Sequence, residues 1–318
     1  MPPRPIHEPR RDTCPWCGSA RLRTRLRAPD LIHRRPGTFG LDQCRDCAHT
    51  FQNPRLSAEG LDLYRRSPGE QDAARLAARV LAARTARRRL RATARVMLPF
   101  PEPESWLDVG TGQAMFPAAA RDVFAYTAFD GVDPTSRVVS ARDAGRLEEA
   151  HQGELSHPGT YTRLRARYDV VSMLHHLEHT LDPRAELAAA LHALRPGGHL
   201  LLELPDPQSA FAALLGKWWV PYGQPRHLHL IPLANLRAEL ESRGCAVVRA
   251  DRGGAHVPHD LSAALSVALT RAIPAPRTGL LRATAPLVAA ATALDHTLAP
   301  LLRHTRFSNT YRLIARKG

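Results

Sequence analysis

Short apolar runs and helix-like segments alternate between residues 105 and 251. The runs SWLDVG, YDVVSML and GHLLLELP have the length and composition of buried strands, and the segment PRAELAAALHAL between two of them is rich in helix formers. Strands that alternate with helices usually pair in parallel, and the crossover helices cover both faces of the sheet. The sequence therefore predicts an α/β fold with a mostly parallel sheet.

The first of these runs continues into a glycine turn, in WLDVGTGQAMF (106–116). A phosphate-binding P-loop requires Gly-Lys-Ser/Thr, but Gln113 follows Gly112. A dinucleotide fingerprint requires a third glycine where Met115 stands. The acid ahead of the glycines, Asp108, would repel a pyrophosphate but suits a cationic ligand. S-adenosylmethionine (SAM), with an ammonium and a sulfonium group and no phosphate, fits this pattern.

A second acid supports a nucleoside ligand. A carboxylate that binds ribose hydroxyls is expected at the end of the next strand, about 20 residues after the glycines. In FDGVDP, Asp133 closes an apolar run at about that distance from Gly110. Asp130 is the rival, but it precedes the final Gly-Val of the run. We therefore predict that Asp133 binds the ribose.

Four of the five cysteines form two Cys-x-x-Cys pairs, CPWC and CRDC, which contain Cys14, Cys17, Cys44 and Cys47. Each turn places two thiolates on one side, and two such turns complete a tetrahedral Zn²⁺ site. Disulfides are the alternative, and a reducing cytoplasm disfavours them. Four sulfur ligands leave no open position for substrate, so the predicted zinc is structural.

The formal charge of +14 lies mostly within residues 1–100. Two interpretations stay open: compositional drift toward arginine, or a basic face for an acidic partner such as a nucleotide-sugar, a carrier protein, nucleic acid or anionic lipid. The N-terminal stretch MPPRPIHEPRRDT lacks the apolar core of a secretory signal. We therefore expect a cytoplasmic protein.

These stretches together resemble the class I SAM-dependent methyltransferases. YDVVSMLHHLEHTLDP is similar to the family's fourth strand and the loop after it, and LRPGGHLLLELP to its helix-turn-fifth-strand signature. CRDCAHTFQNPRLSAEGLDLY is similar to the zinc-binding module fused ahead of many bacterial sugar and natural-product methyltransferases. The resemblance covers residues 14–251 and 306–317. It implies a Rossmann-like seven-stranded sheet with helices on both faces, and SAM as cofactor.

The same resemblance and the proline-rich break LPFPEPE suggest five segments. They are a zinc-ribbon-like module (1–56), a helical linker (57–98), a SAM-dependent methyltransferase domain (99–255), a helical insertion (256–305) and a closing strand (306–318). We expect two or three helices in the insertion, broken near Pro274–Pro276 and Pro286. A lid or a subunit contact is the first expectation for it. The second is an amphipathic contact with a membrane surface, which would make the protein peripheral to the membrane.

Carried over by position, the resemblance assigns the cofactor site. The methionine end of SAM would be held by the acid and the glycine turn, Asp108, Gly110, Thr111 and Gly112. Asp133 would hold the ribose, Glu154 and Leu155 would contact the adenine, and His175 would lie beside the cofactor. Ala114 replaces the commoner third glycine, a small departure that alanine tolerates if its φ stays negative.

Methyl transfer is an in-line displacement, so the enzyme positions the acceptor and, where needed, removes its proton. Two base candidates are His176, after the fourth strand, and His227, in PRHLHL. The segment KWWVPYGQPRHLHLIPLANL resembles the region after strand five in deoxysugar C-methyltransferases, where a Glu-His pair takes part in acid–base work. Arg226 stands here in place of that glutamate, which counts against carbon methylation, while His227 remains as a base.

The predicted function is methyl transfer from SAM to a small-molecule or carrier-linked acceptor, sugar-like or natural-product-like, by O- or C-methylation. A nucleic-acid (RNA) methyltransferase is the alternative. It is less favoured because MLHHLEH lacks the Asn/Asp-Pro-Pro-aromatic motif of base-amino methylation, and the chain has no Pro-Cys nucleophile. A non-catalytic zinc-ribbon adaptor on a methyltransferase scaffold is the alternative of another class, and the intact acids and glycines of the SAM pattern argue against it.

Overall fold

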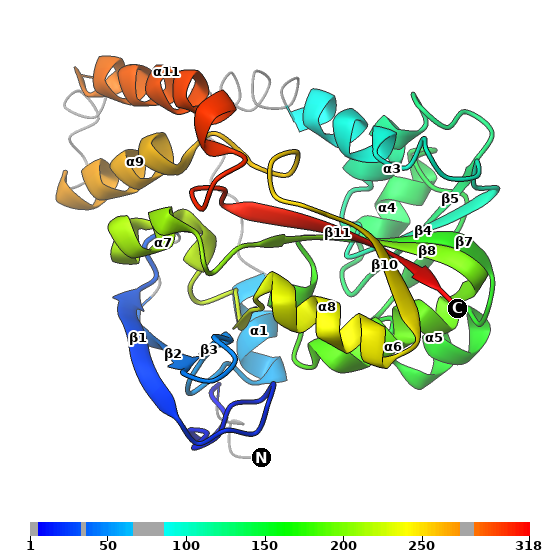
Figure 1. The fold of residues 1–318 in the computed structure, drawn as a ribbon, viewed down its shortest axis with the longest axis horizontal. Coiled ribbons are helices and arrows are strands. Elements are labelled where there is room, and N and C mark those ends of the chain that lie inside the picture. Colours follow the sequence, from blue (N-terminus) through cyan, green and yellow to red (C-terminus); the bar gives the residue numbers. More distant parts are fainter. Residues whose placement is uncertain (1–5, 33–35, 66–85, 274–282) are drawn as a thin grey trace.

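A computed structural model of the chain describes residues 6–32, 36–65, 86–273 and 283–318, and it contains a seven-stranded sheet and a four-stranded sheet (Figure 1). The larger sheet has the order β10-β11-β8-β7-β4-β5-β6. Its strands are β4 (Ser105–Val109), β5 (Ala128–Asp133), β6 (Ala150–Gln152), β7 (Tyr168–Leu174), β8 (Leu194–Pro205), β10 (Cys245–Asp251) and β11 (Thr310–Lys317). β11 runs antiparallel to β10 and β8, whereas β6, β5, β4, β7 and β8 are parallel to one another.

Helices cover both faces of this sheet because its strands alternate between two apolar clusters. Leu107 and Val171 point into one cluster with α6 and α8, and Trp106 and Val170 point into the other with α3 and α4. The helices of this part are α3 (Met115–Ala120), α4 (Arg137–Asp143), α5 (Pro158–Arg163), α6 (Pro183–Ala193), α7 (Ala210–Leu214) and α8 (Leu233–Ser242). Three single 3₁₀ turns are η1 (Leu177–His179), η2 (Gly216–Trp218) and η3 (Val220–Tyr222). The predicted fold class is confirmed.

The smaller sheet is antiparallel and has the order β1-β2-β3-β9. β1 (Leu22–Pro29), β2 (Thr38–Cys44) and β3 (Thr50–Gln52) come from the N-terminal module, and α1 (Ala58–Arg65) follows them. The fourth strand, β9 (His229–Leu230), comes from the segment predicted as the methyltransferase domain and pairs with β3. The module from 1–56 therefore shares its sheet with the main domain.

The predicted linker (57–98) is described only in part, because residues 66–85 lie outside the described residues. Residues 86–95 are helical, and Ala94 and Met97 are buried against the face of the sheet that carries α3 and α4. This end of the linker therefore belongs to the core of the main domain.

The predicted insertion (256–305) contains α9 (Asp260–Ala272) and α11 (Ala285–Leu302), which pack on each other. Asp295 on α11 is buried and accepts hydrogen bonds from the first backbone N–H groups of α9, at Leu261 (3.0 Å) and Ser262 (2.9 Å). Pro286 stands in the first turn of α11, and Pro274–Pro276 lie outside the described residues.

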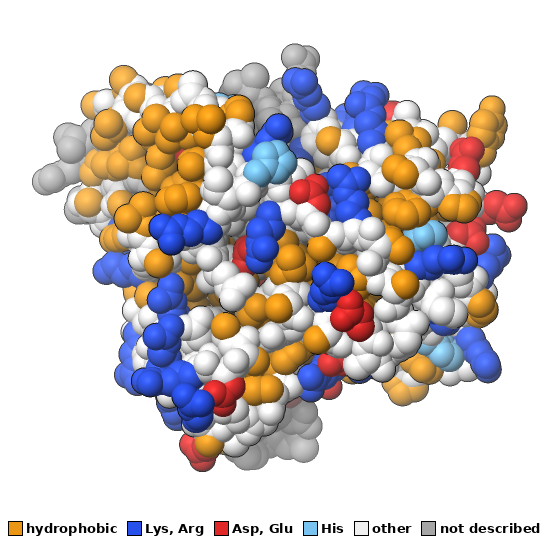
Figure 2. Space-filling view, viewed as in Figure 1, with side chains coloured by type: hydrophobic (Ala, Val, Ile, Leu, Met, Phe, Trp, Pro, Cys, Tyr) orange, Lys and Arg blue, Asp and Glu red, His pale blue; other side chains and the backbone are white. Residues whose placement is uncertain are grey.

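Much of the surface of α11 is apolar and exposed, including Leu287, Leu294 and Leu301. Figure 2 shows hydrophobic side chains gathered over α9 and α11, at the upper left of that view. Within the described ranges, α11 is the one helix that is long and apolar enough to cross a membrane, judged by length and composition only.

Candidate active site

The turn after β4 needs glycine at two positions for different reasons. Gly110 (φ +74°) lies against the imidazole of His176, so a Cβ on Gly110 would overlap that ring. Gly112 (φ +54°) faces open space, with no atom within 4 Å of the place that a Cβ would take. The first glycine permits close packing behind the turn, and the second leaves its backbone accessible to a ligand.

Ala114, at the N-terminus of α3, does not meet the condition under which alanine is readily tolerated at this position. Its φ is +54° and its ψ is 41°, in the left-handed region and not negative. The residue is fully buried beside Trp106 and Phe116, and the turn continues left-handed through it. Left-handed backbone costs a residue with a Cβ roughly 1–2 kcal/mol, which the surrounding packing offsets.

Asp133 ends β5 and holds the glycine turn. Its carboxylate accepts hydrogen bonds from the backbone N–H of Gly112 (2.9 Å) and from the backbone N–H and hydroxyl of Thr135 (2.8 and 2.5 Å). The rival acid, Asp130, accepts from the Tyr168 hydroxyl (2.8 Å) and the Glu149 backbone N–H (2.9 Å). Asp130 therefore ties strands together, and Asp133 lies at the turn.

Asp108 is buried at the end of β4, with 4% of its surface exposed. It accepts a hydrogen bond from the Ser172 hydroxyl at 2.6 Å. Burial raises the pKa of Asp108 to about 6, against the lowering effect of this hydrogen bond. A buried carboxylate with a raised pKa is stabilised by a nearby cation, such as the ammonium group of a bound ligand.

The residues predicted to bind SAM lie around two adjoining cavities. A cavity of about 300 Å³ is lined by Gly110, Gly112, Asp133, His175 and His176, together with Leu61, Pro134, Thr135, Arg137, His179 and Arg226. A second cavity of about 140 Å³ is lined by Asp108, Thr111, Gly110 and His175 among others. Glu154 is exposed beyond β6 and Leu155 is buried in the core, and neither lines these two cavities. Thr135, Arg137 and Arg226 line the first cavity without having been predicted.

A larger cavity, of about 1060 Å³, adjoins the first. His175, His179 and Arg226 line both, so the two spaces meet at these side chains. Another part of the wall comes from the insertion, with His256, His259, Ser262, Thr292 and His296. The enclosure is of the size that small-molecule ligands occupy, or larger.

His175 lies between two buried carboxylates. Its φ is +54°, an uncommon conformation for a residue with a Cβ. Its Nδ1 lies 3.2 Å from Glu178 Oε1, and its Nε2 lies 3.7 Å from Glu203 Oε1. Burial by itself lowers the pKa of His175, but the two carboxylates raise it to about 9. Backbone strain at a charged side chain that lines all three cavities marks a functional position.

Glu178 and Glu203 were missed by the sequence reasoning. Glu203 forms a buried ion pair with Arg312 on β11 (2.9 Å), and Thr93 lies 3.4 Å from the same carboxylate oxygen. The available signal was a glutamate inside an otherwise apolar run, LLLELP. Burying an ionised group is costly unless it is paired, so such a residue indicates a partner elsewhere in the chain.

The two predicted base candidates lie in different places. His227 lines the large cavity, and its Nδ1 donates a hydrogen bond to the Pro221 carbonyl at 2.8 Å. His176 lines the cofactor-side cavity, with its Nε2 3.5 Å from Glu186 Oε2, and does not line the large cavity. Burial lowers the pKa of His227, and it lowers the pKa of His179 to about 3, so both rings are neutral.

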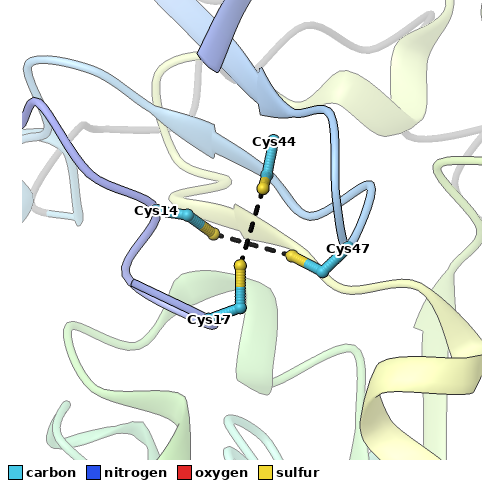
Figure 3. Close-up of side chains that lie close together, drawn as sticks. All are labelled: Cys14, Cys17, Cys44 and Cys47. Atoms are coloured by element: carbon cyan, nitrogen blue, oxygen red, sulfur yellow. Dashed lines mark hydrogen bonds between the residues drawn. The ribbon is translucent and has the colours of Figure 1, made fainter. Parts of the chain in front are cut away.

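The four cysteines of the two pairs converge at one point, as Figure 3 shows. The Sγ atoms of Cys14 and Cys47 lie 3.6 Å apart, as do those of Cys17 and Cys44. All four are free thiols. A tetrahedral zinc ion with Zn–S bonds near 2.3 Å would separate its sulfur ligands by about 3.8 Å. The cluster therefore has the donor set and the spacing of a closed zinc site.

The cysteine cluster is fastened to the main domain. The Asn235 side chain on α8 donates a hydrogen bond to the Cys47 carbonyl (2.9 Å). Trp16, between the first two cysteines, lies under the guanidinium of Arg184 on α6, at 4.6 Å from the ring centroid. These contacts place the cluster on the side of the sheet that carries α6 and α8.

Comparison with known proteins shows the family. A family model described as "Methyltransferase domain" matches residues 81–250. Among solved structures, a SAM-dependent methyltransferase from Archaeoglobus fulgidus is similar at 17% identity with a TM-score of 0.48, over 73% of this chain and 94% of that one. The magnesium protoporphyrin IX methyltransferase from Synechocystis PCC 6803 is similar at 15% identity with a TM-score of 0.45, over 82% and 95%. No curated protein matches the sequence.

Proposed function

We propose an acceptor for this chain, which belongs to the methyltransferase-domain family and is a SAM-dependent methyltransferase. The proposed acceptor is a small or carrier-linked molecule of the sugar or natural-product kind. The observation that carries the proposal is the junction of the two cavities at His175, His179 and Arg226. A cofactor on one side would present its methyl group to a cavity of about 1060 Å³ on the other. A concave space that combines apolar surface with polar and histidine side chains suits a compact organic molecule.

In this proposal the cofactor lies along the glycine turn. Asp133 holds the ribose hydroxyls, and the open face of Gly112 admits the nucleoside. Asp108 balances the positive charge at the methionine end, where its raised pKa makes a cation favourable. The enzyme then needs to align the acceptor atom, the methyl carbon and the sulfur, which is a matter of positioning.

His227 is the proposed acceptor-side group. Since its Nδ1 donates to a carbonyl and its ring is neutral, its Nε2 carries a lone pair at the wall of the large cavity. Such a nitrogen can accept the proton of an acceptor hydroxyl. His176 lies on the cofactor side, packed beneath Gly110, and we propose that it positions the turn.

The insertion is proposed to act as a lid. His256 and His259, just before α9, and Thr292 and His296 on α11 line the large cavity. Opening this wall would admit an acceptor, and closing it would exclude water. The exposed apolar face of α11 could in addition contact a second subunit or a membrane surface.

The cysteine cluster is proposed to hold one structural Zn²⁺. Four thiolates close the coordination sphere, so the ion would stabilise the module and take no part in methyl transfer. The support is the convergence of the four Sγ atoms within 4.8 Å of one another.

A carrier-linked acceptor is favoured by a basic groove. Arg23 and Arg25 on β1 and Arg306 line a surface groove of about 590 Å³, with no acidic side chain among the described residues around it. Figure 2 shows Lys and Arg side chains along β1, at the left edge of that view. An acidic carrier protein or the phosphate of its prosthetic arm would complement this charge.

The test is calorimetric titration of the zinc-loaded protein with SAM and its demethylated product, followed by a screen of free sugars, carrier-linked acceptors and RNA with methyl-labelled SAM. Label transfer to a small or carrier-linked acceptor supports the proposal. Transfer to RNA alone would replace it with the nucleic-acid alternative, and folded protein that does not bind SAM would favour the adaptor.

A further inference from the structure

Three metal-ligating side chains converge where the two cavities meet. Glu178 and His179 come from η1, directly after β7, and His227 comes from the loop before β9. Ligand atoms of the three lie within 4.8 Å of one another, and the two imidazole rings meet edge to face with centroids 4.6 Å apart. Neither the sequence reasoning nor the proposed function uses these three groups as a unit.

The hydrogen bonds of the two histidines fix which nitrogen is available. His179 Nδ1 lies 3.2 Å from the Arg226 carbonyl, and His227 Nδ1 lies 2.8 Å from the Pro221 carbonyl. A carbonyl oxygen can only accept, so each Nδ1 carries the proton. The ring nitrogen left to bind a metal ion is therefore Nε2 in both histidines. Metal-binding histidines are oriented in this way, with the second ring nitrogen donating to a backbone carbonyl.

Glu178 supplies the independent observation. Its surface is 0% exposed, and its Oε1 lies 3.2 Å from His175 Nδ1. Its other oxygen, Oε2, is buried and has no hydrogen-bond donor among the described residues. A buried carboxylate oxygen without a partner is costly, and a bound cation is one of the few groups that satisfy it.

A second cluster of acidic and histidine side chains shows what carboxylates with protein partners look like. Asp130, Glu149 and His151 also lie within 4.8 Å of one another. The Asp130 carboxylate accepts from the Tyr168 hydroxyl, and Glu149 is paired with Arg167 at 2.9 Å. Those two carboxylates are satisfied by protein donors, so neither acid of that cluster needs an ion, although the buried His151 Nε2 has no hydrogen-bond partner in the described part of the chain.

We propose that Glu178, His179 and His227 bind a divalent transition-metal ion that receives an oxygen of the acceptor in the large cavity. Two imidazoles and one carboxylate suit Zn²⁺, Fe²⁺, Co²⁺ or Mn²⁺ and leave coordination positions open. His175 orients the carboxylate ligand from behind. The part that concerns the acceptor rests on the proposed function and narrows it to transfer onto a hydroxyl oxygen, with the lone pair of His227 Nε2 binding the ion in place of acting as the base.

The reaction balances without a redox step. The acceptor hydroxyl binds the metal, which lowers the pKa of that hydroxyl, and its proton passes to water in the cavity. The resulting alkoxide attacks the methyl carbon of SAM while the carbon–sulfur electron pair stays on sulfur. The products are a methyl ether and neutral S-adenosylhomocysteine, and the metal ion is unchanged.

The experiment titrates Co²⁺ into protein whose cysteine cluster is already filled with Zn²⁺. We expect one further equivalent of Co²⁺, with absorption bands of nitrogen and oxygen ligation and without a cobalt–thiolate charge-transfer band. Glu178→Gln and His227→Ala should each weaken this binding by about a hundredfold or more, since even outer-shell partners contribute 10- to 100-fold. The matched control is Glu149→Gln in the satisfied cluster, which should bind Co²⁺ like the wild type.

Calorimetry with SAM and a thermal unfolding curve accompany each variant, so loss of folding is distinguished from loss of a ligand. If folded wild-type protein takes up no second metal, or if both variants bind Co²⁺ like the wild type, the metal site is wrong. If Co²⁺ binds as expected and SAM does not, the proposed function fails while the metal site stands. SAM-dependent methylation that is unaffected by chelation would remove the catalytic role of the ion.

Discussion

The carboxylate of Asp133 accepts a hydrogen bond from the backbone N–H of Gly112 at 2.9 Å, so the acid that ends β5 holds the turn that ends β4. Two neighbouring strands are joined at their carboxyl ends by this bond, where open α/β sheets bind ligands.

Asp133→Ala is expected to abolish SAM binding in calorimetry, because it removes both the proposed ribose ligand and the anchor of the turn. It should also lower the free energy of unfolding by about 1–3 kcal/mol, since three donors lose their acceptor. Asp143→Ala, on the exposed side of α4, is the control and should bind SAM like the wild type. Unchanged SAM affinity in Asp133→Ala would contradict the assignment.

The two glycines of the turn should respond differently to alanine. Gly110→Ala drives a methyl group into His176 and should destabilise the protein by about 3 kcal/mol or more. Gly112→Ala meets open space and should cost about 1–2 kcal/mol of backbone strain, but its methyl group should weaken SAM binding. Denaturant unfolding and calorimetry measure both. Partial recovery of stability in Gly110→Ala/His176→Ala would identify the overlap as the cause, and equal costs for the two single variants would argue against it.

Ala114→Gly tests the left-handed residue at the start of α3. Relief of backbone strain opposes the loss of a buried methyl group, so the variant should be within about 1 kcal/mol of the wild type in free energy of unfolding. Ala119→Gly, in the same helix and also buried, has no strain to relieve and should cost about 1.5 kcal/mol or more. A larger loss at position 114 than at position 119 would contradict the observed φ.

SAM affinity should depend on pH through Asp108. Burial raises the pKa of Asp108 to about 6 in the free protein, and a bound cation favours the ionised form. Affinity should therefore fall by about tenfold per pH unit below pH 6. The folding stability of the free protein should change in the opposite direction. Because the pKa of Asp108 is higher in the folded than in the unfolded state, the folded state binds the proton first as pH falls. The contribution of Asp108 to the free energy of unfolding should therefore rise as pH falls from 6 toward 4. Asp108→Asn should bind SAM weakly and lose this pH dependence, and a flat wild-type profile from pH 7 to 5 would refute the role.

Metal removal should loosen the N-terminal module. The cysteine cluster of the wild-type protein should hold one Zn²⁺ tightly, and Cys17→Ser should lose that ion. Cys245→Ser, which changes the lone fifth cysteine, should keep it. Trp16 is 7% exposed beneath Arg184, so its fluorescence should shift to the red on chelation as the ring meets water. Elemental analysis that finds no zinc in fully reduced wild-type protein would reject the site.

The sheet and the glycine turn were predictable because their signals are local. SWLDVG and YDVVSML are buried strands in which alternate side chains enter opposite clusters, and short-range periodicity records such strands. Asp133 was also within reach, since its distance from the glycines is set by the length of one strand-helix-strand unit.

The ion pairs of the buried carboxylate Glu203 could not be predicted from the sequence, because its partners are distant along the chain. Arg312 finds Glu203 across 109 residues of sequence, and no local pattern records such a pairing. The left-handed φ of Ala114 and His175 was likewise unpredictable. In a sequence, glycine is the residue that indicates a left-handed backbone, and neither position is a glycine. The insertion could be predicted as helical, but its place as a cavity wall depends on tertiary packing.

The strand β9 limits which segments of this protein can be exchanged with those of a relative. Its two residues complete the sheet of the cysteine module, and His229 stacks on His49 at 5.3 Å between ring centroids. A chimaera that exchanges only residues 1–56 with a relative would seat a foreign β3 against a native β9. Donor and recipient would have to trade two segments at once, one from the start of the chain and one around His229–Leu230. The zinc module should therefore not fold correctly when it is exchanged by itself. The module and the loop that carries His227 should instead be retained or exchanged together.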